Sequence, residues 1–250
     1  MSLMNNKYYI VRLGDFATNG NTKILYFIFS LFLCIEEYIT IKSFDCIKIM
    51  LGSSIIWSII ELFLHLSNTR IIKPMQIGFG NNKRNINTYL GICLQGIQEG
   101  GFVTTTGLYF GDRIFNFKYL ICLHLFILFI ILNIIIKKNN KEASKRQINS
   151  NNSIIFMTVS TLYNLKIIYQ YPNHIYRQFK MFCMMIYICS IWTYVVWYNN
   201  FRKVEILIKD ENNKFVEKKI NNLDSLYVLG YDVIFEIGIA YLTFYNLFII

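Results

Sequence analysis

The feature that most constrains this fold is an apolar run of 18 residues without formal charge, YLICLHLFILFIILNIII, from Tyr119 to Ile136. At about 1.5 Å of rise per residue, a helix of this length crosses the roughly 30 Å hydrocarbon core of a bilayer. The rest of the 250-residue chain is similar in character, with 54% hydrophobic residues and a mean hydropathy of +0.38. Ordinary soluble domains are less apolar than this. The sequence therefore predicts an integral membrane protein, with the lipid bilayer as its first partner.

Further apolar blocks, separated by polar breaks, predict an all-α bundle of about seven transmembrane helices. The bundle forms one polytopic membrane domain over residues 1–250. The expected spans are 24–44, 47–66, 88–111, 117–136, 153–171, 178–200 and 225–249. The third and fifth of these are the weakest, because they contain the most polar groups. The fourth has little polarity and is expected to face lipid.

The distribution of basic residues predicts the orientation of the bundle. Under strict alternation of the seven spans, eighteen of the 25 lysines and arginines lie at one set of helix ends and six at the other. Positive charge accumulates on the cytoplasmic side of membrane proteins. The amino terminus is therefore predicted to be cytoplasmic and the carboxyl terminus to lie on the opposite side. Which membrane holds the protein is not encoded in this pattern.

Two polar connections on the predicted cytoplasmic side differ in pattern. Within the loop 201–224, the segment VEILIKDENNKFVEKK alternates apolar and polar residues on both sides of a turn sequence, which predicts a small β-hairpin at 204–219. The segment 137–152 is polar and lacks periodicity, so we expect a flexible linker there. The loop 70–85 mixes apolar residues with glycine and proline, and is expected to lie on the membrane surface or to cap the bundle.

The net charge of +10 is explained by this orientation and does not indicate a nucleic-acid partner, since no nucleic-acid-binding motif accompanies the basic stretches. The six cysteines are scattered singly and form no CxxC pair. No Walker A loop, GxSxG elbow, HExxH helix or kinase signature is present. No cofactor is therefore predicted by motif, and no metal site is expected.

Polar side chains inside the second predicted span point to a site. The stretch WSIIELFLHL places Glu61 and His65 one helical turn apart, on the same helix face as Ser58, with Trp57 beside them. A charged group at mid-membrane costs about 2.5–3.5 kcal/mol even on lenient scales. Such groups persist where they face one another, a watery cavity or a ligand.

Other predicted spans supply matching groups at overlapping depths. The third contains Gln95, Gln98 and Glu99, and the seventh contains Asp232 and Glu236, four residues apart. At about 1.5 Å per residue, these acids lie roughly 10 to 20 Å from the cytoplasmic helix ends, and Glu37 of the first span lies in the same slab. The pattern predicts an acidic intramembrane pocket formed by the first, second, third and seventh helices. Its candidate acid–base residues are Glu61, His65, Glu99, Asp232 and Glu236, and its candidate ligand-binding residues are Trp57, Ser58, Gln95, Gln98 and Glu37.

Three classes of function fit such a pocket. The first binds or processes a lipid-like or cationic small molecule, as an enzyme or a carrier. The second is a proton- or cation-coupled transporter or channel. The presence of six acids and one lysine inside the spans favours this class, although no internal repeat is visible. The third is a non-catalytic receptor, scaffold or assembly factor whose polar core sets helix pairing. We favour the first class and leave open whether the protein is an enzyme.

Overall fold

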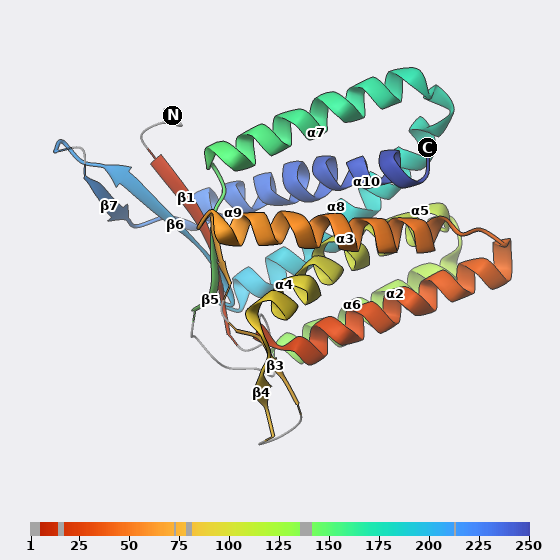
Figure 1. Ribbon diagram of the computed structural model, residues 1–250, viewed down its shortest axis with the longest axis horizontal. Coiled ribbons are helices and arrows are strands. Elements are labelled where there is room, and N and C mark those ends of the chain that lie inside the picture. Colours follow the sequence, from red (N-terminus) through yellow and green to blue (C-terminus); the bar gives the residue numbers. More distant parts are fainter. Residues whose placement is uncertain (1–5, 15–17, 73, 79–81, 136–141, 213) are drawn as a thin grey trace.

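The computed structural model describes residues 6–14, 18–72, 74–78, 82–135, 142–212 and 214–250. In this part of the chain, seven long helices run roughly side by side (Figure 1). Five of them are single elements: α2 (Gly20–Ile41), α3 (Asp45–Leu66), α6 (Phe117–Ile135), α7 (Asn151–Gln170) and α8 (Ile175–Tyr198), the last of which follows the short turn η2 (Pro172–His174). The other two are continuous helices of three elements each. One joins α4 (Thr88–Gly96), η1 (Ile97–Phe102) and α5 (Val103–Asp112), and the other joins α9 (Asn222–Tyr231), η3 (Asp232–Ala240) and α10 (Tyr241–Phe248). Each corresponds to one of the predicted spans.

Four of these helices are long and apolar enough to cross a membrane. They are α2, α3, the helix 172–198 and the helix 222–248, and a shorter apolar stretch covers Phe117–Leu132. The helix 88–112 and α7 do not meet these criteria within the described residues, because their polar residues lower the mean hydropathy. The protein therefore has several helices of membrane-spanning character, and the count of seven crossings stays a prediction.

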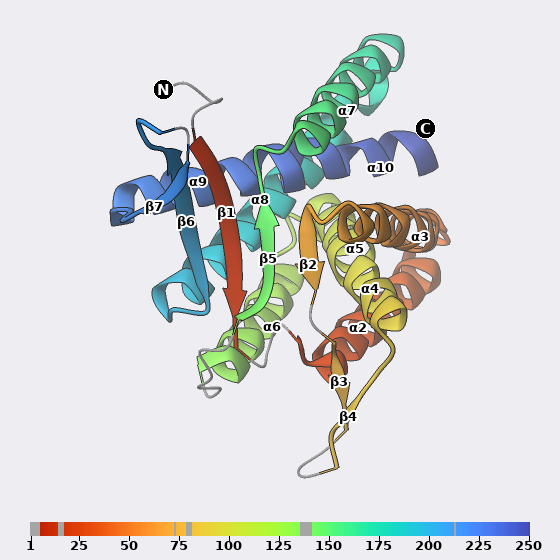
Figure 2. The same cartoon turned by 60° about the vertical axis from the view of Figure 1, so that its left-hand side comes forward.

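A five-stranded antiparallel sheet lies at one end of the bundle (Figure 2). Its strands follow the order β2 (Arg70–Ile72), β5 (Glu142–Gln147), β1 (Asn6–Leu13), β6 (Arg202–Lys209) and β7 (Phe215–Lys218). A second pair, β3 (Gln76–Ile77) and β4 (Arg84–Asn85), forms a separate two-stranded sheet. The prediction of an all-α fold is therefore incomplete.

Two predictions for the loops have opposite outcomes. The hairpin is confirmed, since β6 and β7 pair in antiparallel register, with Ile206 opposite Lys218. The flexible linker is wrong for residues 142–147, because β5 lies between β1 and β2 and bonds to both. Residues 137–141 of the predicted linker lie outside the described residues. Strand β5 has no apolar alternation, so its strand character comes from its two neighbours and not from its own sequence.

The sheet gathers chain segments that are far apart in sequence. Strand β1 precedes α2, β2 follows α3, β5 lies between α6 and α7, and β6 follows α8. Each pair of helices between these strands therefore leaves the sheet end of the bundle and returns to it. The last helix leaves this end and does not return, and α10 ends at the far end of the bundle (Figure 1).

Glycines allow α3 and the middle of the helix 88–112 to approach closely. A Cβ atom added at Gly100 would lie 2.5 Å from the carbonyl oxygen of Ser53, and one at Gly96 would lie 2.6 Å from the backbone nitrogen of Ser58. Real side chains do not tolerate such distances to backbone, so only glycine permits this packing. The close approach places Glu99, between these glycines, against α3.

The outward surfaces of the helices are apolar. Exposed side chains include Ile28 and Phe32 of α2, Ile59 and Phe63 of α3, and Leu125 of α6. Such a surface suits contact with acyl chains. Helix α6 is not only a lipid-facing element, however, because its other face buries Leu123, Ile127 and Ile130.

Candidate functional site

The inner face of the sheet, which lies against the helices, carries four arginines. Strand register places Arg70 of β2 opposite Arg146 of β5, and Arg12 of β1 opposite Arg202 of β6. Like charges directly opposite one another destabilise a sheet unless something compensates them. The compensation comes from four carboxylates on the helices: Glu61 of α3, Glu99 of η1, and Asp232 and Glu236 of η3.

The largest group of contacts centres on Glu99. Arg12 and Arg70 both form ion pairs with it, and Arg70 Nη1 lies 2.8 Å from Glu99 Oε2. Arg70 also pairs with the fully buried Glu61. Two neutral donors complete the group, since Gln95 Nε2 donates to Glu99 Oε1 and Trp57 Nε1 donates to Glu99 Oε2 over 3.3 Å. Burying a charge is costly unless it is paired and hydrogen-bonded in this way.

Two further ion pairs join the sheet to the last helix. Arg202 Nη2 lies 2.6 Å from Asp232 Oδ2, and its Nη1 donates to Thr193 Oγ1 at 2.9 Å. Arg146 Nη2 lies 2.5 Å from Glu236 Oε1. Through these contacts the strands are tied to η3 and α8, just as the Glu99 group ties them to α3 and η1.

The pKa values of Arg70 and Arg202 reflect how many carboxylates each of these two residues contacts. Burial disfavours the charged form of Arg70, but Glu61 and Glu99 together outweigh it and hold its pKa well above the usual range. Burial lowers the pKa of Arg202, and Asp232 only partly offsets the effect. The guanidinium of Arg202 is thus less fully compensated than that of Arg70.

Three of the four carboxylates stand on π-helical segments. Glu99 lies in η1, and Asp232 and Glu236 lie in η3. A π-helix bonds i to i+5 and is less regular than an α-helix, and such segments occur frequently at functional sites. Both segments lie where their helices pass the inner face of the sheet, so the irregular backbone coincides with the charged network.

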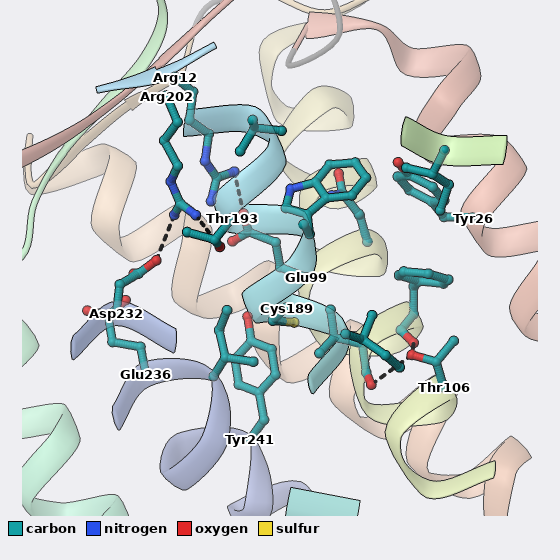
Figure 3. A pocket seen from close by; sticks show the side chains of 18 of the residues that line it. Arg12, Tyr26, Glu99, Thr106, Cys189, Thr193, Arg202, Asp232, Glu236 and Tyr241 are labelled. Atoms are coloured by element: carbon teal, nitrogen blue, oxygen red, sulfur yellow. Dashed lines mark hydrogen bonds and ion pairs between the residues drawn. The ribbon is translucent and has the colours of Figure 1, made fainter. Parts of the chain in front are cut away.

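A cavity of about 110 Å³ lies between this network and the helices. Its charged end is lined by Arg12, Lys23, Arg70, Arg146, Arg202, Glu99, Asp232 and Glu236. Its remaining wall is mostly apolar and aromatic, with Tyr26, Phe102, Phe126, Ile127, Ile130, Ile188, Trp192 and Tyr241 among the lining residues. Figure 3 shows Arg12 and Arg202 reaching from the sheet toward Glu99 and Asp232, with Tyr241 below them. The cavity is therefore amphipathic.

The charge on this wall differs from the prediction of an acidic pocket. Five cationic side chains line the cavity against three carboxylates, and the fourth carboxylate, Glu61, pairs with Arg70. The acidic description is therefore wrong in sign. The reason is that the acids come from apolar helices, where the sequence reveals them, whereas four of the cations come from strands outside the predicted spans.

Several donors of the network have no partner among the described residues. The Nε atoms of Arg70, Arg146 and Arg202 are buried without a hydrogen bond among the described residues. Lys23 is only 4% exposed and donates to Gln98 Oε1, without an ion pair to any described carboxylate. Buried donors normally have acceptors, so these atoms indicate capacity for a further acceptor.

Most of the predicted site residues meet at this place. Glu99, Asp232, Glu236, Trp57 and Gln98 line the cavity. Glu61 and Gln95 stand behind them, bonded to Arg70 and Glu99.

Three predicted residues neither line the cavity nor bond to a residue that does among the described contacts. Glu37 lies near the end of α2 remote from the sheet, where its Oε2 accepts from the backbone nitrogen of Cys46 at 2.8 Å. Ser58 Oγ donates to the carbonyl of Ser54 at 2.7 Å, and His65 Nδ1 is buried without a described partner. For Glu37 the cause is depth, because α2 begins at Gly20 and places Glu37 far beyond the charged network.

Sequence reasoning missed Arg12, Lys23, Arg70, Arg146 and Arg202 as site residues and counted them only as orientation signals. A signal was present in two segments. In YIVRL and FRKVEILI, arginine stands in alternation with apolar residues, which is the spacing of one face of a strand.

Within the described part of the chain, no group of three or more His, Cys, Asp or Glu side chains is placed to hold a metal ion. Each carboxylate of the network is instead engaged by a guanidinium group. Comparison of the chain with models of known families, with curated proteins and with solved structures gave no match.

Proposed function

We propose that this protein is a multi-pass membrane protein that binds a lipid-like small molecule in the cavity between the helices and the sheet. The observation that carries the proposal is a single cavity with a charged end and an apolar wall. Ligand pockets typically combine a predominantly apolar lining with a few polar groups that fix orientation. A lipid-like molecule has the same division between a polar head and an apolar chain.

The position of the cavity supports this choice. Its apolar wall comes from α2, α6, α8, the helix 88–112 and the helix 222–248, and three of these, α2, α8 and the helix 222–248, belong to helices of membrane-spanning character. A ligand seated there would have its chain among the helices and its head at the sheet. The π-helical segments at the charged end are in keeping with a binding site.

The cationic ligand and the proton or cation pathway receive less support. Each of the four carboxylates is already paired with an arginine, and the cavity wall carries more cations than carboxylates. A cation entering this cavity would meet five positive groups. The scaffold function is the competing outcome, in which the network only holds helices and sheet together.

The proposal is tested by filling the cavity from α6. Ile127 points into the wall and is 9% exposed, whereas the next residue, Leu128, is 51% exposed on the outer surface. Native mass spectrometry and lipid extraction of the purified full-length protein would compare Ile127→Trp with Leu128→Trp. We expect bound lipid-like mass in the wild type and in Leu128→Trp, and its loss in Ile127→Trp.

Overpacking of a core costs about 1–3 kcal/mol, so folding of each variant is checked by its thermal transition in detergent. Ile127→Phe provides a smaller filling if the tryptophan variant does not fold. Equal ligand content in all variants, or none in the wild type, would contradict the proposal and favour the scaffold.

A further inference from the structure

The charged end of the cavity carries a surplus of positive charge within the described residues. The network contains four carboxylates if Glu61, which pairs with Arg70, is included. It contains five cationic groups: Arg12, Lys23, Arg70, Arg146 and Arg202. Four ion-paired arginines account for the four acids, and the group left over is Lys23. This inference rests on the proposed binding of a lipid-like ligand and concerns the chemistry of its head.

Lys23 is buried in the first turn of α2, on the cavity wall, with Gln98 as its hydrogen-bond acceptor. An ammonium group has three donors and no acceptor. A glutamine oxygen satisfies one of these donors and supplies no negative charge. A buried cation of this kind is stabilised by a paired anion, and no described carboxylate forms an ion pair with Lys23.

The unpartnered guanidinium atoms point to the same chemistry. Arg70 and Arg202 are 3% and 6% exposed, both line the cavity, and each retains a buried Nε–H without an acceptor among the described residues. Arginine is a donor only, so a head group that brings oxygen acceptors to these residues suits them, and a cationic or purely apolar head does not. Planar guanidinium groups favour carboxylate and phosphate oxygens in particular.

We propose that the ligand is a single-chain lipid with a monoanionic carboxylate head, bound with the head at Lys23 and the strand arginines. Charge selects the monoanion, because one negative charge balances the surplus of one. The cavity is about 110 Å³, less than the 150 Å³ that accommodates benzene in an engineered core, so it has room for a head group and only the first carbons of one chain. Two chains beside one head do not fit this volume, and the remainder of a single chain would lie outside the cavity.

The test uses the full-length protein in non-ionic detergent and four probes of matched chain: oleate, oleyl alcohol, oleylamine and lysophosphatidic acid with an oleoyl chain. Affinities are measured by isothermal titration at one ionic strength. We expect oleate to bind at least tenfold more tightly than the alcohol and the amine, since a charge-assisted hydrogen bond is worth roughly this factor or more. This series needs no variant, so it remains decisive if a variant does not fold.

Lys23→Gln provides the second measurement, with Lys166→Gln as its matched control. Lys166 is exposed on α7 and is not part of the cavity wall. We expect Lys23→Gln to weaken oleate binding roughly tenfold to hundredfold and to leave oleyl alcohol unchanged. Lys23→Arg keeps the charge and is expected to retain most of the oleate affinity. The control is expected to bind all four probes as the wild type does.

The outcomes separate this inference from the proposed function. Equal affinity for oleate, alcohol and amine, with all three lost in Ile127→Trp, would overturn the carboxylate head while the lipid-binding function stands. Tighter binding of lysophosphatidic acid than of oleate would overturn the monoanion in favour of a phosphate head. Absence of binding by any probe, with no bound lipid in the purified wild type, would remove the proposed function itself.

Discussion

The two faces of the five-stranded sheet use positive charge in opposite ways. Arg146 and Arg202 face inward, and their side chains are 11% and 6% exposed. The adjacent residues, Lys145 and Lys203, face outward on the same strands and are 30% and 50% exposed. Both lysines pair with Glu205, also on the outer face, whereas the arginines pair with acids of the helices.

This difference follows from the chemistry of the two side chains. Arginine presents a rigid fork of donors and is less strongly hydrated than lysine, so it suits buried pairs with carboxylates. Lysine is a well-hydrated point charge and suits a surface. A basic residue in a connection between membrane helices can thus either set the orientation of the protein or form ion pairs in its interior. In a strand, alternate residues point to opposite faces, so neighbouring basic residues serve these two roles.

The difference between the inner and outer faces of the sheet is tested most strongly at Arg70. Arg70→Met would leave both Glu61 and Glu99 without this guanidinium group in a buried environment, which costs about 3–5 kcal/mol of unfolding free energy. Lys203→Met on the outer face is the matched control, and an exposed pair of this kind is worth at most about 1 kcal/mol. Unfolding of both variants in detergent, followed by tryptophan fluorescence, measures the difference. Similar losses for the two substitutions would show that the faces are not distinct.

A finer test exchanges the two basic side chains. Arg202 donates through Nη1 to Thr193 and through Nη2 to Asp232, and a lysine cannot reproduce both bonds. We expect Arg202→Lys to destabilise the protein by about 1–3 kcal/mol, the cost of leaving a buried polar group unsatisfied. The reciprocal change on the outer face, Lys203→Arg, is expected to leave the melting temperature nearly unchanged. A neutral Arg202→Lys would mean that charge alone, without the fork geometry, suffices on the inner face.

The smallest expected effect concerns Glu205 and pH. Burial alone would raise the pKa of Glu205, but hydrogen bonds from Lys145 and Lys203 outweigh it and lower the pKa. A carboxyl group whose pKa is lowered by folding stabilises the protein above its unfolded value, near 4.3, and this contribution is lost as pH falls through the folded value. The stability difference between wild type and Glu205→Gln, below about 1 kcal/mol at pH 7, should therefore shrink on acidification to pH 3. A difference that grows at acidic pH would contradict this assignment.

The helices could be predicted from sequence because each carries its own signal. The apolar blocks locate all seven, and the boundaries of α3, for example, differ from the prediction by two residues at most. The β6–β7 hairpin was also readable, since its two strands are joined by a short turn and their alternation is local.

The rest of the sheet could not be predicted in the same way. Strand β1 pairs with β5 across about 130 residues, and β5 consists of EASKRQ, which has no strand-forming pattern of its own. The inner-face arginines were hidden for the same reason. Without the pairing register, nothing separates Arg146 from its neighbour Lys145. The acids of the site, by contrast, are conspicuous because apolar residues surround them.

The π-helical segments have a consequence for how readily this site could be lost. A π turn contains one residue more than an α turn, so deleting a single residue from η1 or η3 would restore the ordinary i to i+4 ladder. Because a π turn fits its extra residue into one full rotation, the flanking parts of the helix would keep their faces, and only the side chains within the segment would change direction. The carboxylates would turn away from the strands while the apolar length of the helix stayed nearly the same. The placement of these carboxylates thus depends on local irregularity in two helices.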